Sequence, residues 1–126
     1  MKIISTPHGP TPAGHYSQAV VYGGVVYVAG MLGQDPTDPD RDIGGAGSQT
    51  RQALGNVAAV LKAAGSGLDH VLRMTIYVSD ASLWGEVNAA YAEVMGDHKP
   101  ARAIVPVNAF RDPYLVEIVA TAALGG

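Results

Sequence analysis

One arginine of the sequence lies where its charge could do chemistry. Arg102 is enclosed by mostly apolar residues in the segment 99–106, which reads Lys-Pro-Ala-Arg-Ala-Ile-Val-Pro. A guanidinium held on a strand can bind a small carboxylate through two parallel hydrogen bonds. Glu117 is the only carboxylate of the apolar segment 114–123, and it too could serve either structure or chemistry. The pattern is compatible with an ion pair between Arg102 and Glu117 on neighbouring strands, with snorkelling at a strand end, and with a site for a carboxylate ligand.

Other reactive residue types lack the context that their chemistry needs. The four histidines show no metal-ligand spacing and the chain has no cysteine, so no metal site is predicted. The glycines at 44, 45 and 47 precede a helical pattern but lie in a long polar loop, which argues against a dinucleotide site. Neither Ser17 nor Ser48 has the G-x-S-x-G context of a hydrolase nucleophile. We therefore expect no cofactor.

Composition and charge exclude several classes of protein. The 126 residues carry 8 Lys and Arg against 11 Asp and Glu, a net charge of −3, without a basic cluster for nucleic acid. No apolar run approaches the roughly 18 residues of a membrane span, and the N-terminus lacks the apolar core of a signal peptide. We expect one cytoplasmic domain over residues 1–126. Only 15% of the residues are charged, against roughly 25% in an average protein, which indicates that copies of the chain cover part of its surface.

Two spacings of apolar residues predict the elements that position these side chains. A 3-4-3 spacing predicts a helix that is capped by Ser48 and ends at Gly65, and a second helix is predicted over 82–95. The buried stripe of the second helix would comprise Trp84, Val87, Tyr91, Val94 and Met95. Alternating segments predict strands over 25–30, 71–79, 101–107 and 114–123, with short strands near Ile3 and Val20.

The predicted order is strand, strand, strand, helix, strand, helix, strand, strand, which indicates the α+β class. In the segment 71–78, the even positions are all large and apolar and should lie beneath the helices. The opposite face, with Arg73, Thr75 and Tyr77, has no helix left to cover it, because two helices of this size cover one side of a sheet. A second copy of the chain is its natural cover, so we expect an oligomer built on sheets.

Sequence blocks along the whole chain match those of a known family, namely 3–6, 14–18, 26–30, 49–57, 87–91, 99–103 and 116–118. In these blocks the chain resembles the Rid, or YjgF-type, family of reactive-intermediate deaminases. The resemblance implies the chorismate-mutase-like fold, with about six strands and two helices on one face, assembled as a homotrimer with its sheets inward and a cleft between each pair of subunits. It also implies hydrolysis of enamines or imines of small 2-keto acids to the keto acid and ammonia.

The resemblance further implies roles for particular residues. Arg102 would bind the substrate carboxylate and Tyr16 would close the cleft, which Asn88, Gly30 and Ala103 would line or support. Hydrolysis of an imine requires few catalytic groups, because the imine carbon is already electrophilic. Orientation of the substrate together with an activated water or a proton donor suffices.

The chain departs from the family pattern at polar positions of the cleft. Ala29 stands where deaminating members usually have serine, Ile104 where they often have cysteine, and Val119 where they usually have glutamate. A RutC-like member of the family also lacks this glutamate. The departures predict a drier pocket for a larger or more apolar carboxylate. Glu117, on the same strand face as Val119, or the loop residue His15 could supply the acid–base function.

Three functions stay open at this point. The first is imine deamination, with Arg102, Tyr16 and Glu117 as catalytic residues. The second is a cyclisation, tautomerisation or condensation within a biosynthetic pathway, which a dry cleft would suit. The third is a trimer that binds small carboxylates without turnover. Nuclease activity is poorly supported, because the acidic chain with few aromatic residues provides neither a phosphate funnel nor a stacking platform.

Overall fold

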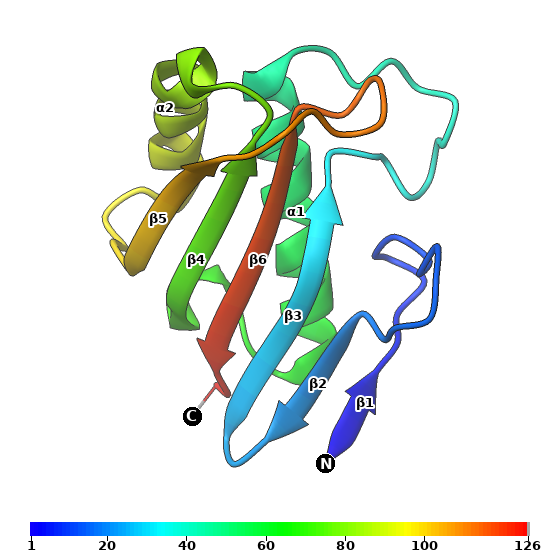
Figure 1. The fold of residues 1–126 in the computed structure, drawn as a ribbon. Helices are drawn as coiled ribbons and strands as arrows, with labels where there is room; N and C mark the ends of the chain where they lie inside the picture. The colour runs from blue at the N-terminus through cyan, green and yellow to red at the C-terminus, as the bar shows by residue number, and fades with distance from the viewer. Residues whose placement is uncertain (126) are drawn as a thin grey trace.

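The computed structural model describes residues 1–125 and contains one six-stranded sheet with two helices on one of its faces (Figure 1). The helices are α1 (Ala46–Ala64) and α2 (Trp84–Met95), and single 3₁₀ turns η1 (Leu68–His70) and η2 (Ala81–Leu83) precede β4 and α2. The strands are β1 (Lys2–Ile4), β2 (Ala19–Tyr22), β3 (Val25–Leu32), β4 (Val71–Val78), β5 (Ala101–Pro106) and β6 (Val116–Ala123). Their order along the chain confirms the predicted α+β class.

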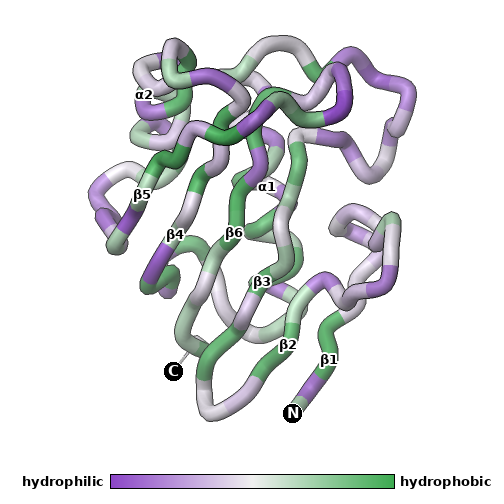
Figure 2. Tube along the Cα trace, viewed as in Figure 1, coloured by the Kyte–Doolittle hydropathy of each residue, from purple (hydrophilic) through white to green (hydrophobic). Residues whose placement is uncertain are grey.

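The strands are arranged in the order β1-β2-β3-β6-β4-β5. All neighbours are antiparallel except β4 and β5, which are parallel and joined by the crossover through α2. The hydrophobic stretches follow the strands, whereas the long loops are largely hydrophilic (Figure 2). This topology places β5, which carries Arg102, at one edge of the sheet and separates it from β6 by β4.

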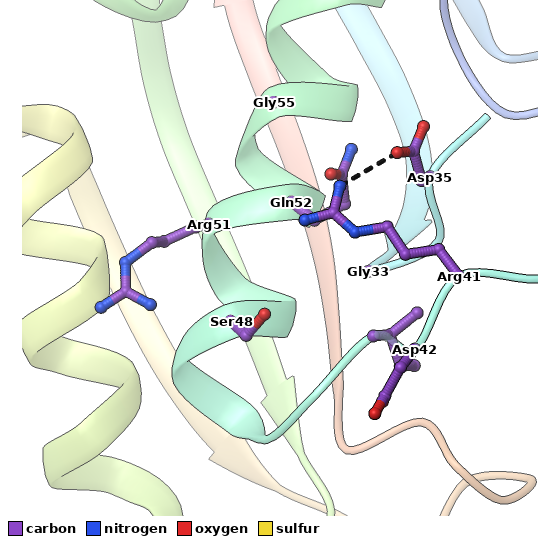
Figure 3. A pocket seen from close by; sticks show the side chains of 9 residues that line it. Gly33, Asp35, Arg41, Asp42, Ser48, Arg51, Gln52 and Gly55 are labelled. Carbon is purple, nitrogen blue, oxygen red and sulfur yellow. Dashed lines mark hydrogen bonds and ion pairs between the residues drawn. The ribbon is translucent and has the colours of Figure 1, made fainter. Parts of the chain in front are cut away.

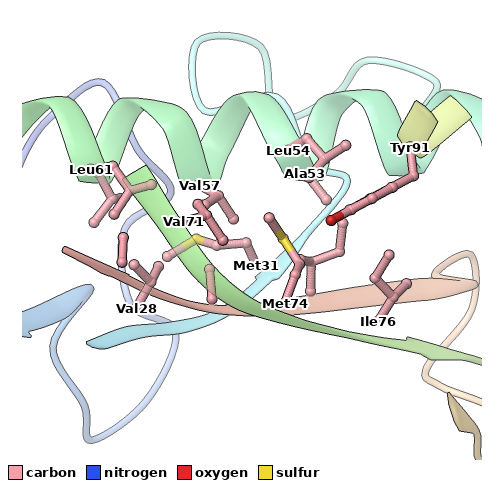
Figure 4. Close-up of a cluster of buried hydrophobic side chains, with 14 of the residues drawn as sticks. Val28, Met31, Ala53, Leu54, Val57, Leu61, Val71, Met74, Ile76 and Tyr91 are labelled. Carbon is pink, nitrogen blue, oxygen red and sulfur yellow. The ribbon is translucent and has the colours of Figure 1, made fainter. Parts of the chain in front are cut away.

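Helix α1 packs its apolar stripe against the helix-facing side of the sheet (Figure 4). It ends at Gly65, as predicted, because this glycine adopts the left-handed conformation with φ 84° that terminates a helix. Its N-cap is Gly45 rather than Ser48, so the helix begins three residues earlier than predicted. The side chain that stabilises this end comes from α2: Glu86 Oε2 accepts a hydrogen bond of 2.6 Å from the Gly47 N–H. A carboxylate there also opposes the positive end of the helix dipole.

No helix in the described part of the chain covers the other face of the sheet, which confirms the prediction (Figure 1). We call it the open face. Thr75 and Tyr77 of β4 are half-buried on it and Arg73 is exposed, while Met74, Ile76 and Val78 are buried under the helices.

Two details of the predicted core are wrong. Leu72 should have lain beneath the helices, but its side chain is 51% exposed, because the register of β4 against β6 shifts between Val71 and Arg73 and Val71 takes the buried position. Trp84 and Val94 were expected on the buried stripe of α2 and are exposed. The buried stripe of α2 instead comprises Val87, Ala90, Tyr91 and Met95.

Candidate active site

Arg102 lies beneath α2 rather than on the open face. Its neighbour in the parallel ladder is Met74, which is fully buried on the helix side. Arg102 Nη1 donates a hydrogen bond of 2.7 Å to Asn88 Oδ1. The guanidinium carbon lies 4.9 Å from the ring centroid of Tyr91 and 5.7 Å from that of Trp84, within the range of cation–π attraction. An amide and two aromatic rings of α2 therefore hold the guanidinium, while its remaining N–H groups stay available for a ligand.

Tyr91 contributes its ring to this arrangement but not its hydroxyl. The residue is 6% exposed, and its ring extends between α1 and the sheet toward Leu54 and Met74 (Figure 4). Its hydroxyl has no hydrogen-bond partner among the described residues. Burial raises the pKa of Tyr91 and the neighbouring Arg102 charge opposes this rise, so the phenol stays neutral at physiological pH. Tyr91 is thus a support for Arg102 and not a proton donor to solvent.

A cavity of about 370 Å³ lies between α2 and the segment that leads into β5. Arg102 and Asn88 line it together with His98 and Lys99. The His98 ring is held by a contact of 2.8 Å between its Nε2 and the Val71 carbonyl oxygen. The Arg102 and Lys99 cations and the Asn88 amide donor lie at one apolar-walled cavity, and this combination suits a small anion such as a carboxylate.

A second group of predicted site residues meets at a β-bulge between β3 and β6. The register passes from Val28 opposite Ala120 to Met31 opposite Ile118, so Ala29 and Gly30 together face the single residue Val119. Such bulges redirect side chains and are frequent beside active sites. The resemblance had singled out Ala29, Gly30 and Val119 individually, and the structure brings the three together.

Glu117 lies over Gly30 at this bulge. A Cβ atom at Gly30 would stand 2.7 Å from Glu117 Oε2, so only glycine leaves room for the carboxylate in this position. Glu117 and Val119 are both half-buried and alternate with buried residues of β6, which confirms that they share the open face. The side chain is therefore a carboxylate placed on the face that no helix covers.

Tyr16 lies near the bulge, in the N-terminal loop. It lines a small hollow together with Gly30, Gln34 and Arg111. Its hydroxyl oxygen accepts a hydrogen bond of 3.1 Å from the Ala13 N–H. The neighbouring His15 is exposed on the same loop. Tyr16, Gly30 and Glu117 thus form one group, which we call the bulge group.

The bulge group and Arg102 do not meet within one chain. Arg102 and Ile104 pair with Met74 and Ile76 on the helix side, and Ile104 packs against the core. Ala103 is exposed on the open face, where it lines a shallow recess with Arg73 and Thr75. An ion pair between Arg102 and Glu117, one of the sequence interpretations, is excluded within the chain, because β4 separates β5 from β6 and the two side chains lie on opposite faces.

Several contributors were missed from the sequence. The spacing placed Tyr91 and Trp84 on the second helix but did not indicate that their rings would surround Arg102. Arg111, in the Tyr16 hollow, carries no spacing signal. Three buried amide side chains that anchor loops could have been found, because they interrupt apolar or structured segments. They are Gln18, which bonds to Thr6 and Pro10, Asn56, which donates to the carbonyl groups of Leu32 and Gln34, and Gln49, which bonds to Gly44, Pro113 and Leu115.

Another recess of about 260 Å³ lies between α1 and the loop 33–45 (Figure 3). Its two arginines already have carboxylate partners: Arg41 Nη1 lies 3.1 Å from Asp35 Oδ2, and Arg51 turns toward α2, where its Nε lies 2.6 Å from Glu93 Oε2. This recess therefore offers less unpaired positive charge than the cavity at Arg102, and we do not assign the site to it.

Comparison with known proteins decides the family. The model of the family described as endoribonuclease L-PSP matches residues 6–124. The chain belongs to this family. The predicted resemblance to the Rid proteins is thereby confirmed, and imine deamination is supported at the level of the family, because its curated members include enzymes named for that reaction.

Three similar proteins illustrate the match. A RutC family protein of Pyrococcus horikoshii is 39% identical over 121 residues, which are 96% of each chain. The 2-iminobutanoate/2-iminopropanoate deaminase of Rattus norvegicus is 37% identical over 98% of this chain and 90% of its own. The crystal structure of E. coli TdcF with bound serine superposes with a TM-score of 0.91 at 28% identity, covering 99% of this chain and 100% of that one.

Neither helix of the described residues is long and apolar enough to cross a membrane. Residues 1–125 also contain no group of three or more His, Cys, Asp or Glu side chains that could hold a metal ion.

Proposed function

We propose that this protein hydrolyses enamines or imines of small 2-keto acids to the keto acid and ammonia, with Arg102 binding the substrate carboxylate. The observation that carries the proposal is the guanidinium itself, fixed by Asn88 and by two aromatic rings beside a cavity. The rat relative is named for this reaction, and the TdcF structure holds serine, a small molecule with a carboxylate.

The proposed reaction uses the geometry in a simple way. Arg102 binds the carboxylate next to the C=N carbon and so orients this electrophilic carbon. Water adds to the carbon, a proton is transferred to the nitrogen, and the C–N bond breaks as the C=O bond forms and ammonia leaves. Glu117 would transfer these protons, and its half-buried position on the open face, over Gly30, supports this role. Tyr16 would close the cleft over the substrate.

The site requires two copies of the chain, and we propose a homotrimer of single-domain subunits. Arg102 with Asn88 would come from one subunit and the bulge group from its neighbour, with Ala103 and His15 at the margins. This arrangement is supported by the separation of the two groups on the sheet and by the open face, on which Tyr27 is 51% exposed. Burial of such a face between subunits also fits the low charge of the chain.

The predicted dry pocket finds only partial support. Ala29 and Val119 do meet at the bulge, which favours the alternative of a cyclisation or condensation that needs no water. Ile104 packs against the core instead, and the Glu117 carboxylate stands beside the two apolar residues. A carboxylate in this place suits hydrolysis better, so deamination remains the function that we propose.

Substitution of Arg102 tests the proposal. Freshly generated 2-iminobutanoate should release ammonia faster with the protein than without it. Arg102→Ala should lower kcat/KM at least a hundredfold, and Arg102→Lys should recover little, because an ammonium lacks the planar fork. Arg51→Ala, which removes an exposed arginine paired with Glu93, is the matched control and should retain full activity.

The outcomes separate the three functions. Absence of any acceleration by the unmutated protein would reject deamination. Formation of a product other than the keto acid would favour the biosynthetic alternative, whereas a ligand-induced rise in melting temperature without turnover would favour a carboxylate-binding protein. Cleavage of RNA by the same preparation, lost in Arg102→Ala, would favour the activity in the family description over ours.

A further inference from the structure

Arg111 lines the hollow of the bulge group and has no part in the reaction described so far. The hollow measures about 60 Å³ and is also lined by Tyr16, Gly30 and Gln34. Arg111 is the only charged residue of its lining. Among residues 1–125, no carboxylate lies within ion-pair distance of this guanidinium. An unpaired positive charge is thus placed next to the bulge group.

The loop that carries Arg111 is held firmly at its base. Gln49, which is fully buried, donates to the Pro113 carbonyl oxygen at 3.0 Å and accepts from the Leu115 N–H at 2.8 Å. The Tyr114 N–H donates to the Arg111 carbonyl oxygen at 3.0 Å and closes a turn. The backbone at Arg111 is therefore fixed relative to the sheet, although its side chain is exposed.

The neutral groups of the hollow also favour an anion. The Tyr16 oxygen already accepts from Ala13, so its O–H remains free to donate. The Gln34 side chain meets the Tyr114 hydroxyl through its oxygen at 3.4 Å, which leaves its NH₂ group as a donor. A guanidinium, a hydroxyl and an amide NH₂ thus surround the hollow with donors, and a carboxylate is the acceptor that matches an arginine fork.

We propose that Arg111 binds a second carboxylate, so that the preferred substrates are imines of dicarboxylic 2-keto acids. The inference rests on the proposed function, in which Arg102 holds the carboxylate next to the C=N carbon. A cleft formed by Arg102 of one subunit and the bulge group of the next has a guanidinium at each end. A substrate with a carboxylate at both ends of a short chain satisfies both.

The test compares two substrates in each variant. The imines of 2-oxoglutarate and of 2-oxobutanoate are generated freshly, and kcat/KM is measured for both. In the unmutated protein the dicarboxylate should be preferred. Arg111→Gln should lower the ratio of dicarboxylate to monocarboxylate kcat/KM by about tenfold to a hundredfold, the usual effect of losing a hydrogen-bonded charge pair. Arg41→Gln, which alters an exposed loop arginine outside the hollow, should leave the ratio unchanged.

A charge reversal sharpens the test. Arg111→Glu should invert the preference, favouring an imine whose side chain ends in a guanidinium over the dicarboxylate. An equal loss of kcat/KM for all substrates in Arg111→Gln would overturn the inference, since it would show that Arg111 serves the assembly or Glu117 rather than a second carboxylate. A ratio unchanged by Arg111→Gln would overturn it as well.

Binding of the stable keto acids keeps this inference separate from the proposed function. Calorimetric titration with 2-oxoglutarate should show tighter binding than with 2-oxobutanoate, and Arg111→Gln should remove most of the difference. If the unmutated protein turned over neither imine, the proposed function would fail while this measurement still decided the role of Arg111. Equal affinity for both keto acids would refute that role.

Discussion

Replacing Gln49 with alanine should lower the free energy of unfolding by about 3 kcal/mol. Gln49 lies in the buried stripe of α1 with no exposed surface, and it anchors two loops. Its Nε2 donates to the carbonyl oxygens of Gly44 and Pro113, each at 3.0 Å, and its Oε1 accepts from the Leu115 N–H at 2.8 Å. Gly44 and Pro113 are exposed, so water can replace the amide at their carbonyl groups.

The magnitude comes mainly from Leu115. This residue is half-buried, and an N–H group left there without a partner costs about 1–3 kcal/mol. Loss of the packed methylene groups of Gln49 adds about 1 kcal/mol. For a chain of this length, each kcal/mol lowers Tm by about 3–5 °C, so a fall of roughly 10 °C is expected.

The assay is urea unfolding followed by circular dichroism at one fixed protein concentration, because assembly would make the apparent stability depend on concentration. Gln52→Ala is the matched control: it removes another amide from α1, but one that is half-buried with a single hydrogen bond to Asn56, and it should cost less than about 1 kcal/mol. Gln49→Glu keeps the shape and removes the donor, so it should be nearly as harmful as alanine at neutral pH. A difference of less than about 0.5 kcal/mol between Gln49→Ala and Gln52→Ala would show that the Gln49 hydrogen bonds do not hold the two loops.

Two further predictions concern single polar groups. Tyr91→Phe should leave stability unchanged or raise it by up to about 1 kcal/mol, because the removed hydroxyl is buried without a partner; a fall of more than about 1 kcal/mol in thermal unfolding would show that the hydroxyl is bonded. Hydrogen bonds from three groups hold the pKa of Asp35 below its ordinary value. The Thr37 hydroxyl has the largest effect, and the Thr37 N–H and Arg41 contribute less. The carboxylate therefore stabilises its loop above the unfolded-state pKa, and this contribution is lost as the pH falls through the lower folded-state pKa. An NMR titration should show the Asp35 pKa rising toward its ordinary value in Thr37→Val, and an unchanged value would contradict the assignment.

The periodicity of the sequence predicted the elements and the open face, because alternation in strands and the 3-4-3 spacing in helices are both set by local geometry. It failed where the ladder is irregular. Leu72 continues a perfect alternation in the sequence, but the register shift beside it turns this side chain outward. Such a shift depends on how β4 and β6 pair and leaves no mark in either segment alone.

The candidate site was predictable only in part, for a related reason. Arg102 and Glu117 stand out because each is the charged residue of an apolar strand, but the partner of Arg102 does not. Asn88 lies 14 residues from Arg102 and reaches it only because the β4-α2-β5 crossover returns α2 over β5. The buried amides did leave a signal, since Gln49 and Asn56 share the 3-4 spacing of the apolar stripe on α1.

The two strongest sequence candidates, Arg102 and Glu117, are the ones that the fold keeps apart. With β4 between them, the backbones of β5 and β6 are about 10 Å apart, and the two side chains leave the sheet on opposite faces. A small imine bound at Arg102 therefore cannot reach the Glu117 carboxylate of the same chain. If both residues act on one substrate, activity must depend on assembly. Mixing inactive Arg102→Ala with inactive Glu117→Gln subunits should then restore activity, because mixed assemblies contain clefts in which both residues are intact; failure to restore it after exchange of subunits would reject the shared cleft.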